Sequence, residues 1–282
     1  MDLIVADAFT DRAFAGNPAA VAFLDDAVPG AWPPEPWMQA LAAEMNLSET
    51  AFVTAPGPDG ARGLRWVTPA VEVPLCGHAT LASAHALAET GRLAPARAAA
   101  FDTASGRLTV TPRPDGAWTL DLPALAAAEA PAPSGLAAVL GQTPVWYGRT
   151  GTDGLAVLPS ADAVRALAPD PAAVAALGVR ALIVTAAGRP SDAPDDDAPR
   201  PDVVSRFFAP GAGIAEDPVT GSAHAALGPF WAARLGRGAL ACEQASARGG
   251  TLAVAVAGDR VHLTGRAVTI LRATLTPAAR PR

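Results

Sequence analysis

The sequence predicts an α+β protein of two pseudo-symmetric lobes, each a sheet around one central helix. The chain contains two copies of one unit, which begin at Arg65 and Arg206. Each copy is an apolar strand followed by a Gly-containing turn and an Ala-rich helix, and strand patterns dominate the rest of the chain. Because such a helix is apolar nearly all round, sheet must surround it.

Both copies contain a helix start that is suited to binding an anion. The first reads Arg65-Trp66-Val67-Thr68-Pro69 and then Cys76-Gly77-His78-Ala79, and the second reads Arg206-Phe207-Phe208-Ala209-Pro210 and then Thr220-Gly221-Ser222-Ala223. A helix N-terminus carries unpaired N–H groups and roughly half a positive charge. Two such ends facing one cleft would hold a small acidic ligand, and the chemistry would come from the surrounding side chains.

Composition excludes several classes of function. The chain has 282 residues, half of them hydrophobic, which suffices for two lobes of about 100–150 residues each. The net charge of −6 argues against nucleic acid as a partner, and the absence of Lys excludes a Schiff-base lysine. Two cysteines, Cys76 and Cys242, cannot form a disulfide scaffold or a four-ligand zinc site.

The N-terminus and the hydropathy pattern indicate a cytoplasmic protein without a membrane partner. Residues 1–7 have no basic region and read as a first strand rather than a signal peptide. No window reaches the roughly 18 uninterrupted apolar residues that a membrane span requires. Phosphate-loop, dinucleotide and serine-hydrolase motifs are also absent from the sequence.

The first lobe is expected to span residues 1–122 and to be completed by a C-terminal strand near 266–277. Apolar runs predict strands, and Gly16-Asn17-Pro18 marks a corner between the first two. Helical spacing after a proline cluster and after the first Gly turn predicts two helices, the second with Gly91 as its C-cap. Pro114-Asp115-Gly116 predicts a hairpin turn. The expected strands are 3–9, 19–24, 50–53, 64–67, 101–110 and 117–122, and the expected helices are 37–45 and 77–90.

The second lobe is expected to span residues 123–265. Residues 123–133 are rich in Ala and Pro and form the crossover between lobes. The run with Asp192, Asp195, Asp196 and Asp197 is either a metal site or a solvated loop, and its prolines favour the loop. The expected strands lie within 146–158 and at 181–185, 203–208, 251–256, 260–263 and 268–275, and the expected helices are 161–167 and 221–235.

Two carboxylates are candidates for proton transfer. Glu49 lies just before an apolar strand, where desolvation raises a carboxyl pKa toward the working range of a general acid or base. A turn or capping role is the alternative for Glu49. Asp217 directly precedes the second Gly turn, where it is either functional or a carboxylate favoured by the helix dipole.

The polar residues of the two Gly turns are further candidates. His78, just inside the first helix, would donate to a substrate carboxylate or shuttle a proton. Ser222 holds the matching position in the second copy, as an N-cap or a ligand donor. Cys76 is either a reactive thiolate or a packing residue, and His224 either flanks the cleft or packs. Gln244 and Arg248-Gly249-Gly250 form another polar cluster before a strand.

Together these motifs resemble the phenazine-biosynthesis PhzF-like isomerase family. The resemblance rests on five segments in order along nearly the whole chain, and these are more specific for the fold than for the substrate. They are Asp7-Ala8-Phe9-Thr10 with Gly16-Asn17-Pro18-Ala19-Ala20-Val21; Asn46-Leu47-Ser48-Glu49-Thr50; Cys76-Gly77-His78-Ala79-Thr80; Glu216-Asp217-Pro218-Val219-Thr220-Gly221-Ser222-Ala223; and Gln244 with Arg248-Gly249-Gly250.

The resemblance implies a diaminopimelate epimerase-like fold, in which each lobe is a curled, mainly antiparallel sheet or barrel around a central helix, with the active site between lobes. It implies Glu49, Asp217 and His78 as catalytic residues, with Glu49 carrying the proton. Substrate contacts would come from Gly77, Ser222, Gly221, Cys76 and Asn17. The implied reaction is isomerisation of trans-2,3-dihydro-3-hydroxyanthranilate or a related compound by a homodimer that needs no metal or organic cofactor.

Two alternatives to this isomerase are considered. In racemases of this fold, cysteines at both Gly turns serve as the two bases. Here Thr220 stands at the second position, so a thiol-dependent racemase that uses Cys76 is not expected. The other alternative is a non-catalytic protein that binds a metabolite or a partner and has kept the fold. The intact set of Glu49, His78, Asp217 and Ser222 favours the enzyme.

Overall fold

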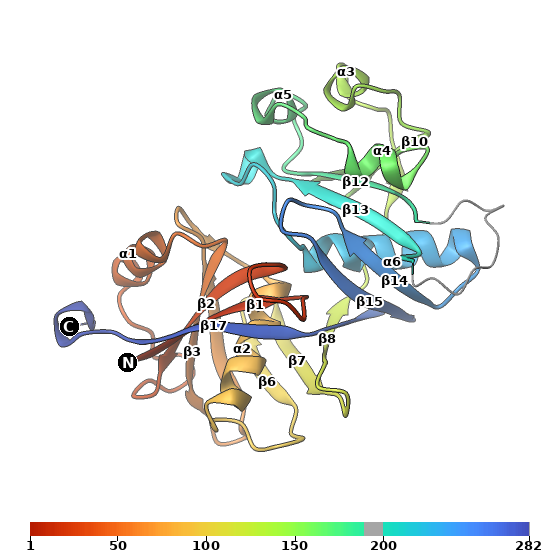
Figure 1. Ribbon diagram of the computed structural model, residues 1–282. Coiled ribbons are helices and arrows are strands. Elements are labelled where there is room, and N and C mark those ends of the chain that lie inside the picture. The colour runs from red at the N-terminus through yellow and green to blue at the C-terminus, as the bar shows by residue number, and fades with distance from the viewer. Residues whose placement is uncertain (189–199, 282) are drawn as a thin grey trace. The chain divides into compact units, whose positions relative to one another are not determined.

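The protein is described here from a computed structural model, in which residues 1–188 and 200–281 are defined (Figure 1). The chain divides into two compact units. The N-terminal unit comprises residues 1–122 and 264–282, and the C-terminal unit comprises residues 123–263. The acidic run from Asp192 to Asp197 lies outside the described residues. Within the described residues, no helix combines the length and the apolar character needed to cross a membrane.

The N-terminal unit is a mainly antiparallel sheet with two parallel pairings. The antiparallel pairs are β17 with β1, β1 with β2, β3 with β4, β6 with β7, and β7 with β8. The parallel pairs are β2 with β3 and β4 with β6. The strands are β1 (Asp2–Ala8), β2 (Asn17–Leu24), β3 (Glu49–Pro56), β4 (Arg62–Val67), β5 (Glu72–Val73), β6 (Ala99–Thr103), β7 (Gly106–Pro112), β8 (Trp118–Pro123) and β17 (Ala267–Thr274). The helices are α1 (Glu35–Met45) and α2 (Gly77–Glu89), followed at the C-terminus by the 3-10 turn η2 (Pro277–Ala279).

The C-terminal unit repeats this order of pairings. β10 and β11 are antiparallel, β11 and β12 parallel, β12 and β13 antiparallel, β13 and β14 parallel, and β14 and β15 antiparallel. The strands are β9 (Ala128–Glu129), β10 (Trp146–Thr150), β11 (Asp153–Val157), β12 (Leu182–Ala187), β13 (Val203–Phe208), β14 (Ala239–Gln244), β15 (Gly250–Ala257) and β16 (Arg260–Gly265). The helical elements are α3 (Leu136–Leu140), α4 (Ala161–Arg165), α5 (Pro171–Ala175), η1 (Pro210–Ala212) and α6 (Gly221–Leu235).

The duplication is therefore visible in the strand pairings. In each unit the long Ala-rich helix, α2 or α6, connects a strand to its parallel neighbour, β4 to β6 or β13 to β14. The strand that begins each repeated order, β1 or β10, also has a further partner. β17, from the C-terminal end of the chain, pairs with β1, and the short β9 pairs with β10.

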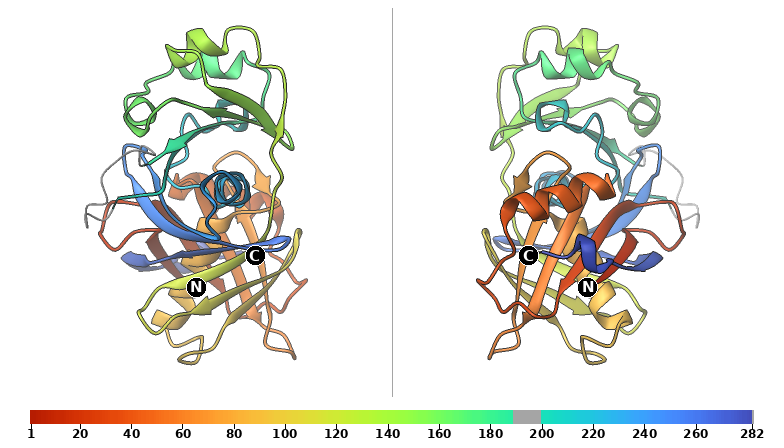
Figure 2. Two further views of the ribbon diagram at one scale, coloured as in Figure 1. Left: turned by 90° about the vertical axis from the view of Figure 1, so that its right-hand side faces the viewer. Right: turned by 90° about the vertical axis from the view of Figure 1, so that its left-hand side faces the viewer.

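The central helices are enclosed by their sheets, as their composition requires. Ten residues of α2 are buried, including the polar residues His78, Thr80 and Ser83. Ala and Gly side chains allow strands to approach the helix from several sides, while α1 lies on the outer face of the sheet in Figure 2, right. There Trp37 of α1 packs edge-on against Phe52 of β3, with the ring centroids 5.9 Å apart.

Some predicted elements were wrong in detail. Residues 101–110 are not one strand, because the chain turns between β6 and β7, where Gly106 has a φ of +90°. β14 was missed: Gln244 ends this strand and precedes the predicted strand β15, and the Ala-rich sequence of β14 lacks the β-branched residues that mark strands. The short helices α3 and α5 and the two-residue strands β5 and β9 were also missed, since elements of two to five residues carry too little periodicity.

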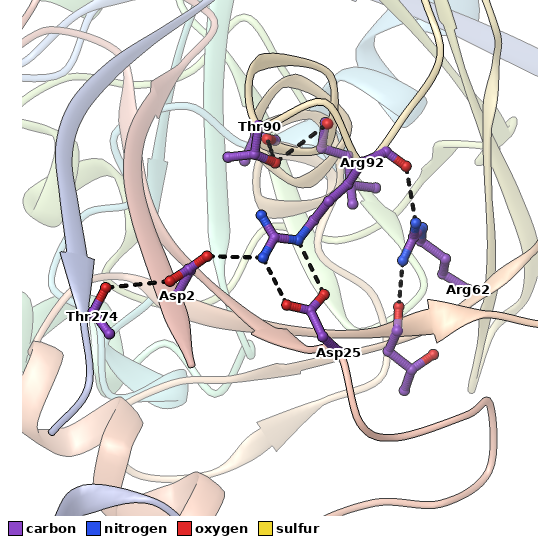
Figure 3. A network of polar contacts seen from close by, with 9 residues as sticks. Asp2, Asp25, Arg62, Thr90, Arg92 and Thr274 are labelled. Carbon is purple, nitrogen blue, oxygen red and sulfur yellow. Dashed lines mark hydrogen bonds and ion pairs between the residues drawn. The ribbon is translucent and has the colours of Figure 1, made fainter. Parts of the chain in front are cut away.

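One ionic network joins five segments of the N-terminal unit (Figure 3). Arg92, just after α2, forms a two-pronged ion pair with Asp25 at 3.0 and 2.7 Å and a contact of 2.9 Å with Asp2 of β1. The Thr274 hydroxyl of β17 donates to Asp2, and Arg62 of β4 donates to the Arg92 carbonyl. The network therefore ties the C-terminal strand to the first strand and to the end of α2.

Replacing Arg92 by Met should destabilise the N-terminal unit by about 1–2 kcal/mol, because its side chain is 20% exposed and makes several charged hydrogen bonds. The matched control is Arg107→Met. Arg107 also pairs with two carboxylates, but its side chain is 51% exposed, so little change is expected. Urea unfolding of the three proteins measures the difference, and equal losses in both variants would contradict it.

His224 is a packing residue of α6. It is fully buried, and its Nδ1–H donates to the Thr220 carbonyl at 2.8 Å, while Nε2 lies 3.5 Å from the Ser205 hydroxyl of β13. Desolvation lowers the pKa of His224 from 6.5 to about 4. In the unfolded chain this histidine takes up a proton below pH 6.5, whereas in the folded chain it stays neutral until about pH 4.

Folding should therefore lose stability as the pH falls from 6.5 toward 4. Between pH 7 and pH 5 the contribution of His224 to this loss is about 2 kcal/mol. The variant His224→Gln has no such proton uptake and should lose that much less over the same interval, whatever its stability at pH 7. Urea unfolding at both pH values tests this, and parallel losses in wild type and variant would refute it.

Candidate functional site

Glu49 opens β3 on the inner, helix-facing side of its sheet. The preceding helix α1 ends at Asn46, whose left-handed φ of 49° and N–H bond to the Ala42 carbonyl close the helix. Three residues later the chain enters β3 beside Ala19 of β2. Glu49 is 8% exposed, so its carboxylate is held in a largely water-free position by the backbone of the strand.

His78 brings an imidazole to this carboxylate. It is the second residue of α2, it is 2% exposed, and its Nε2 lies 3.2 Å from Glu49 Oε2. The two atoms are in close contact but do not have the geometry of a hydrogen bond. On the other side of the ring, the Asn17 amide nitrogen lies 3.0 Å from Nδ1.

The protonation state of His78 follows from these contacts. A ring N–H of His78 donates to the Pro18 carbonyl, and the Asn17 amide lies beside Nδ1. Burial lowers the pKa of His78 from 6.5 to about 3. The imidazole is therefore neutral at physiological pH and not a cation.

Asn17 is fixed by the corner that the sequence predicted. Gly16 has a φ of +64°, and a Cβ at this position would lie 2.2 Å from the Ala8 carbonyl oxygen, so only glycine fits. Asn17 itself is completely buried and opens β2. A backbone constraint thus places the Asn17 amide beside the His78 ring.

Cys76 is the N-cap of α2, with an extended backbone, and its Sγ lies 3.5 Å from His78 Nδ1. Among the residues that the structure describes, Glu49, Cys76 and His78 have potential metal-ligating atoms within 4.8 Å of one another. The sulfur lies beside Nδ1 and the carboxylate beside Nε2.

A second polar cluster lies in the C-terminal unit, in front of α6. The Thr220 hydroxyl donates to Asp217 Oδ2 at 2.5 Å. Gln244 of β14, which is completely buried, accepts from the Thr220 N–H at 2.8 Å and donates to the Asp217 carbonyl at 2.7 Å. Gln244 therefore clamps the loop that sets both Asp217 and the first turn of α6.

An ion pair that the sequence analysis missed supports this loop. Arg206 of β13 forms a two-pronged bridge with Glu216 at 2.7 and 2.8 Å. The same bridge occurs in the first copy, where Arg65 of β4 binds Glu72 at 2.7 and 2.5 Å. The signal was in the sequence, since each Glu lies two residues before a Pro and five residues before the Gly that opens the helix.

The predicted site residues thus fall into two sets. Glu49, His78, Asn17, Cys76 and Gly77 come together in the N-terminal unit. The others belong to the C-terminal unit, namely Asp217, Gly221 and Ser222. Their participation in one site with Glu49 stays a prediction. The alternative of Ser222 as N-cap was wrong, because Thr220 caps α6 and Ser222 is the second helical residue.

Comparison with known proteins identifies the family. The model of the family described as "Phenazine biosynthesis-like protein" matches residues 6–273. An uncharacterised isomerase of Pseudomonas aeruginosa is 46% identical over 264 residues, which cover 94% of each chain. The crystal structure of a phenazine biosynthesis protein of the PhzF family from Enterococcus faecalis has a TM-score of 0.86 and 39% identity, and the match covers 97% of this chain and 99% of that chain.

The fold extends to more distant proteins. The crystal structure of a hydroxyproline epimerase from Agrobacterium vitis has a TM-score of 0.54 at 14% identity and covers 97% of this chain and 91% of that chain, which shows a common fold alone. These neighbours and the strand-rich units confirm the predicted fold class. The chain therefore belongs to the phenazine biosynthesis-like family of PhzF-like isomerases.

Proposed function

We propose that this protein is a cofactor-independent isomerase that moves a proton within a small carboxylate substrate, with Glu49 as the general acid and base. The observation that carries the proposal is the buried Glu49 carboxylate, 3.2 Å from the neutral imidazole of His78 at the start of α2. The substrate is trans-2,3-dihydro-3-hydroxyanthranilate or a related compound, by analogy with the phenazine-related names of the family and its solved members.

A single residue, Glu49, can carry the proton through the whole proposed reaction. The Glu49 carboxylate removes a proton from the ring carbon that bears the hydroxyl group and becomes a carboxylic acid. It then returns a proton to another ring carbon, and the resulting enol rearranges to the ketone. Glu49 ends in its starting state, so no oxidant, reductant or second base takes part.

His78 acts as a positioning residue in this scheme. With a pKa of about 3 it cannot hold the transferred proton near neutral pH. Its Nε2 lies 3.2 Å from Glu49 Oε2 and confines the carboxylate to one orientation, which lowers the entropic cost of reaching the reacting carbon. Asn17, whose amide nitrogen lies 3.0 Å from Nδ1, holds the ring in place.

The substrate carboxylate would bind the helix N-terminus. The first-turn N–H groups of α2, beginning at Gly77, have no partners within the helix and carry partial positive charge. Because His78 is neutral, it adds no positive charge beside Glu49, and the helix dipole attracts the substrate carboxylate. We further propose that the protein acts as a homodimer, as the family resemblance implies.

Glu49→Gln should abolish turnover, because an amide of nearly the same shape cannot carry the proton. The expected fall in kcat is roughly 10³-fold or more. The protein and substrate are incubated in D2O, and the ring protons are followed by NMR. Conversion with deuterium uptake in the wild type, lost in the variant, is the predicted result.

The matched control is Glu44→Gln, the same change at an exposed position of α1, which should keep full activity. Turnover by the Glu49 variant at the rate of this control would refute Glu49 as the carrier. Stoichiometric ligand binding without proton exchange in the wild type would instead favour a non-catalytic binding protein.

The charge of His78 gives an independent prediction. Between pH 8 and pH 5 its ring should stay neutral, because burial keeps the pKa near 3. In ¹⁵N-histidine NMR spectra, its two ring-nitrogen signals should keep the shifts of a neutral imidazole over this interval. An exposed histidine titrates near pH 6.5 and serves as the reference. Titration of His78 near that pH would contradict a purely positioning role.

A further inference from the structure

Trp66 lies on the same face of the sheet as Glu49. In the antiparallel pair of β3 and β4, Trp66 stands opposite Ala51, and opposed residues share one face. Glu49 is two residues from Ala51 and so points to that face as well. Asn17 contacts His78 of the enclosed helix and therefore lies on the inner face of the sheet. It is two positions along β2 from Ala19, which is the parallel neighbour of Glu49, so Glu49 lies on the inner face as well. Trp66 thus belongs to the lining that faces α2.

Trp66 is also a diagonal neighbour of Glu49. Such a pair is separated by roughly 7–8 Å between Cα atoms, within reach of aromatic and long side chains. On its other side, Trp66 opposes Val73 of β5, which leads through Pro74 and Leu75 into the turn at Cys76. The indole is therefore placed between the strand that carries the proposed acid and the segment that precedes the anion-binding turn.

The indole N–H of Trp66 has no hydrogen-bond partner among the residues that the structure describes, although the side chain is only 1% exposed. A buried N–H without a partner costs free energy, and native structures rarely keep one without a reason. Trp231 shows the usual arrangement, since its Nε1 donates to the Thr185 hydroxyl at 3.0 Å. Thr50, whose hydroxyl is also unsatisfied, stands opposite Val67 and faces α1 instead.

We propose that the Trp66 Nε1–H donates a hydrogen bond to an oxygen of the substrate bound at Glu49. This inference rests on the proposed function and adds a specificity residue to it. The bound molecule must present a hydrogen-bond acceptor, a carboxylate or hydroxyl oxygen, toward the Trp66 side of the proton that Glu49 transfers. A substrate with a purely apolar edge there would leave the N–H buried and unpaired, and the site would reject it.

The test uses 3-hydroxyanthranilate, an unreactive aromatic counterpart of the substrate, titrated calorimetrically into the full chain. Trp66→Phe keeps a flat apolar ring and removes the N–H, and its Kd should rise roughly 10-fold or more. Trp231→Phe removes the same atoms at a site where the N–H is satisfied, and its Kd should stay within twofold of the wild-type value.

Thermal unfolding without ligand should show the opposite order. Both variants lose the same ring atoms, so their packing costs are similar. Trp231→Phe also leaves the Thr185 hydroxyl without its donor, whereas Trp66→Phe removes a donor that had no partner. The Tm of Trp231→Phe should therefore fall further. A purely structural role of Trp66 would lower its Tm and leave Kd unchanged.

The outcomes separate this inference from the proposed function. Wild-type affinity in Trp66→Phe, with the Glu49→Gln variant inactive, would overturn the role of Trp66 and leave the isomerase intact. No binding of the probe to the wild type would overturn the anthranilate-like substrate and the Trp66 contact together. A raised Kd in Trp66→Phe, with unchanged affinity in Trp231→Phe, would support the contact.

Discussion

The fold depends on burying a helix on nearly every side. The Ala-rich α2 can be covered only by a sheet that curves round it, and this forces its N-terminus, with the N–H groups of the first turn, into the interior. Buried polar groups need partners. Several residues around that end are accordingly polar, among them Asn17, Glu49 and His78. The candidate site is a direct consequence of enclosing the helix.

The two copies of the repeated unit share the same order of strands and helix but differ in the side chains at matching positions. Glu49 precedes Thr50, which opposes Val67, and in the second copy Ala181 precedes Leu182, which opposes Phe208. The carboxylate of the first copy therefore has no counterpart in the second. Conversely, Asp217 lies four residues before the glycine of its turn, where the first copy has Val73. What both copies retain is the Arg–Glu bridge that holds the loop before the helix.

The sequence was sufficient for the features that depend on strong local patterns. The repeated strand, turn and helix predicted α2 and α6 to within a residue or two, and Gly91, with a φ of +72°, follows the end of α2. Local patterns could not reveal contacts between distant segments. The pairing of Asn17 with His78 spans 61 positions, and the clamp of Gln244 on Thr220 depends on a strand without strand-like composition.

The neutral state of His78 restricts the chemistry that the N-terminal cluster can perform. Racemisation by two bases needs two groups that exchange protons on opposite faces of one carbon. In this cluster the imidazole resists protonation because it is buried. The proposed proton carrier is then the Glu49 carboxylate, which would remove a proton and return it elsewhere on the same molecule. A site with one proton carrier and a helix dipole for an anion is suited to shifting a double bond in a carboxylate, and much less suited to inverting a stereocentre.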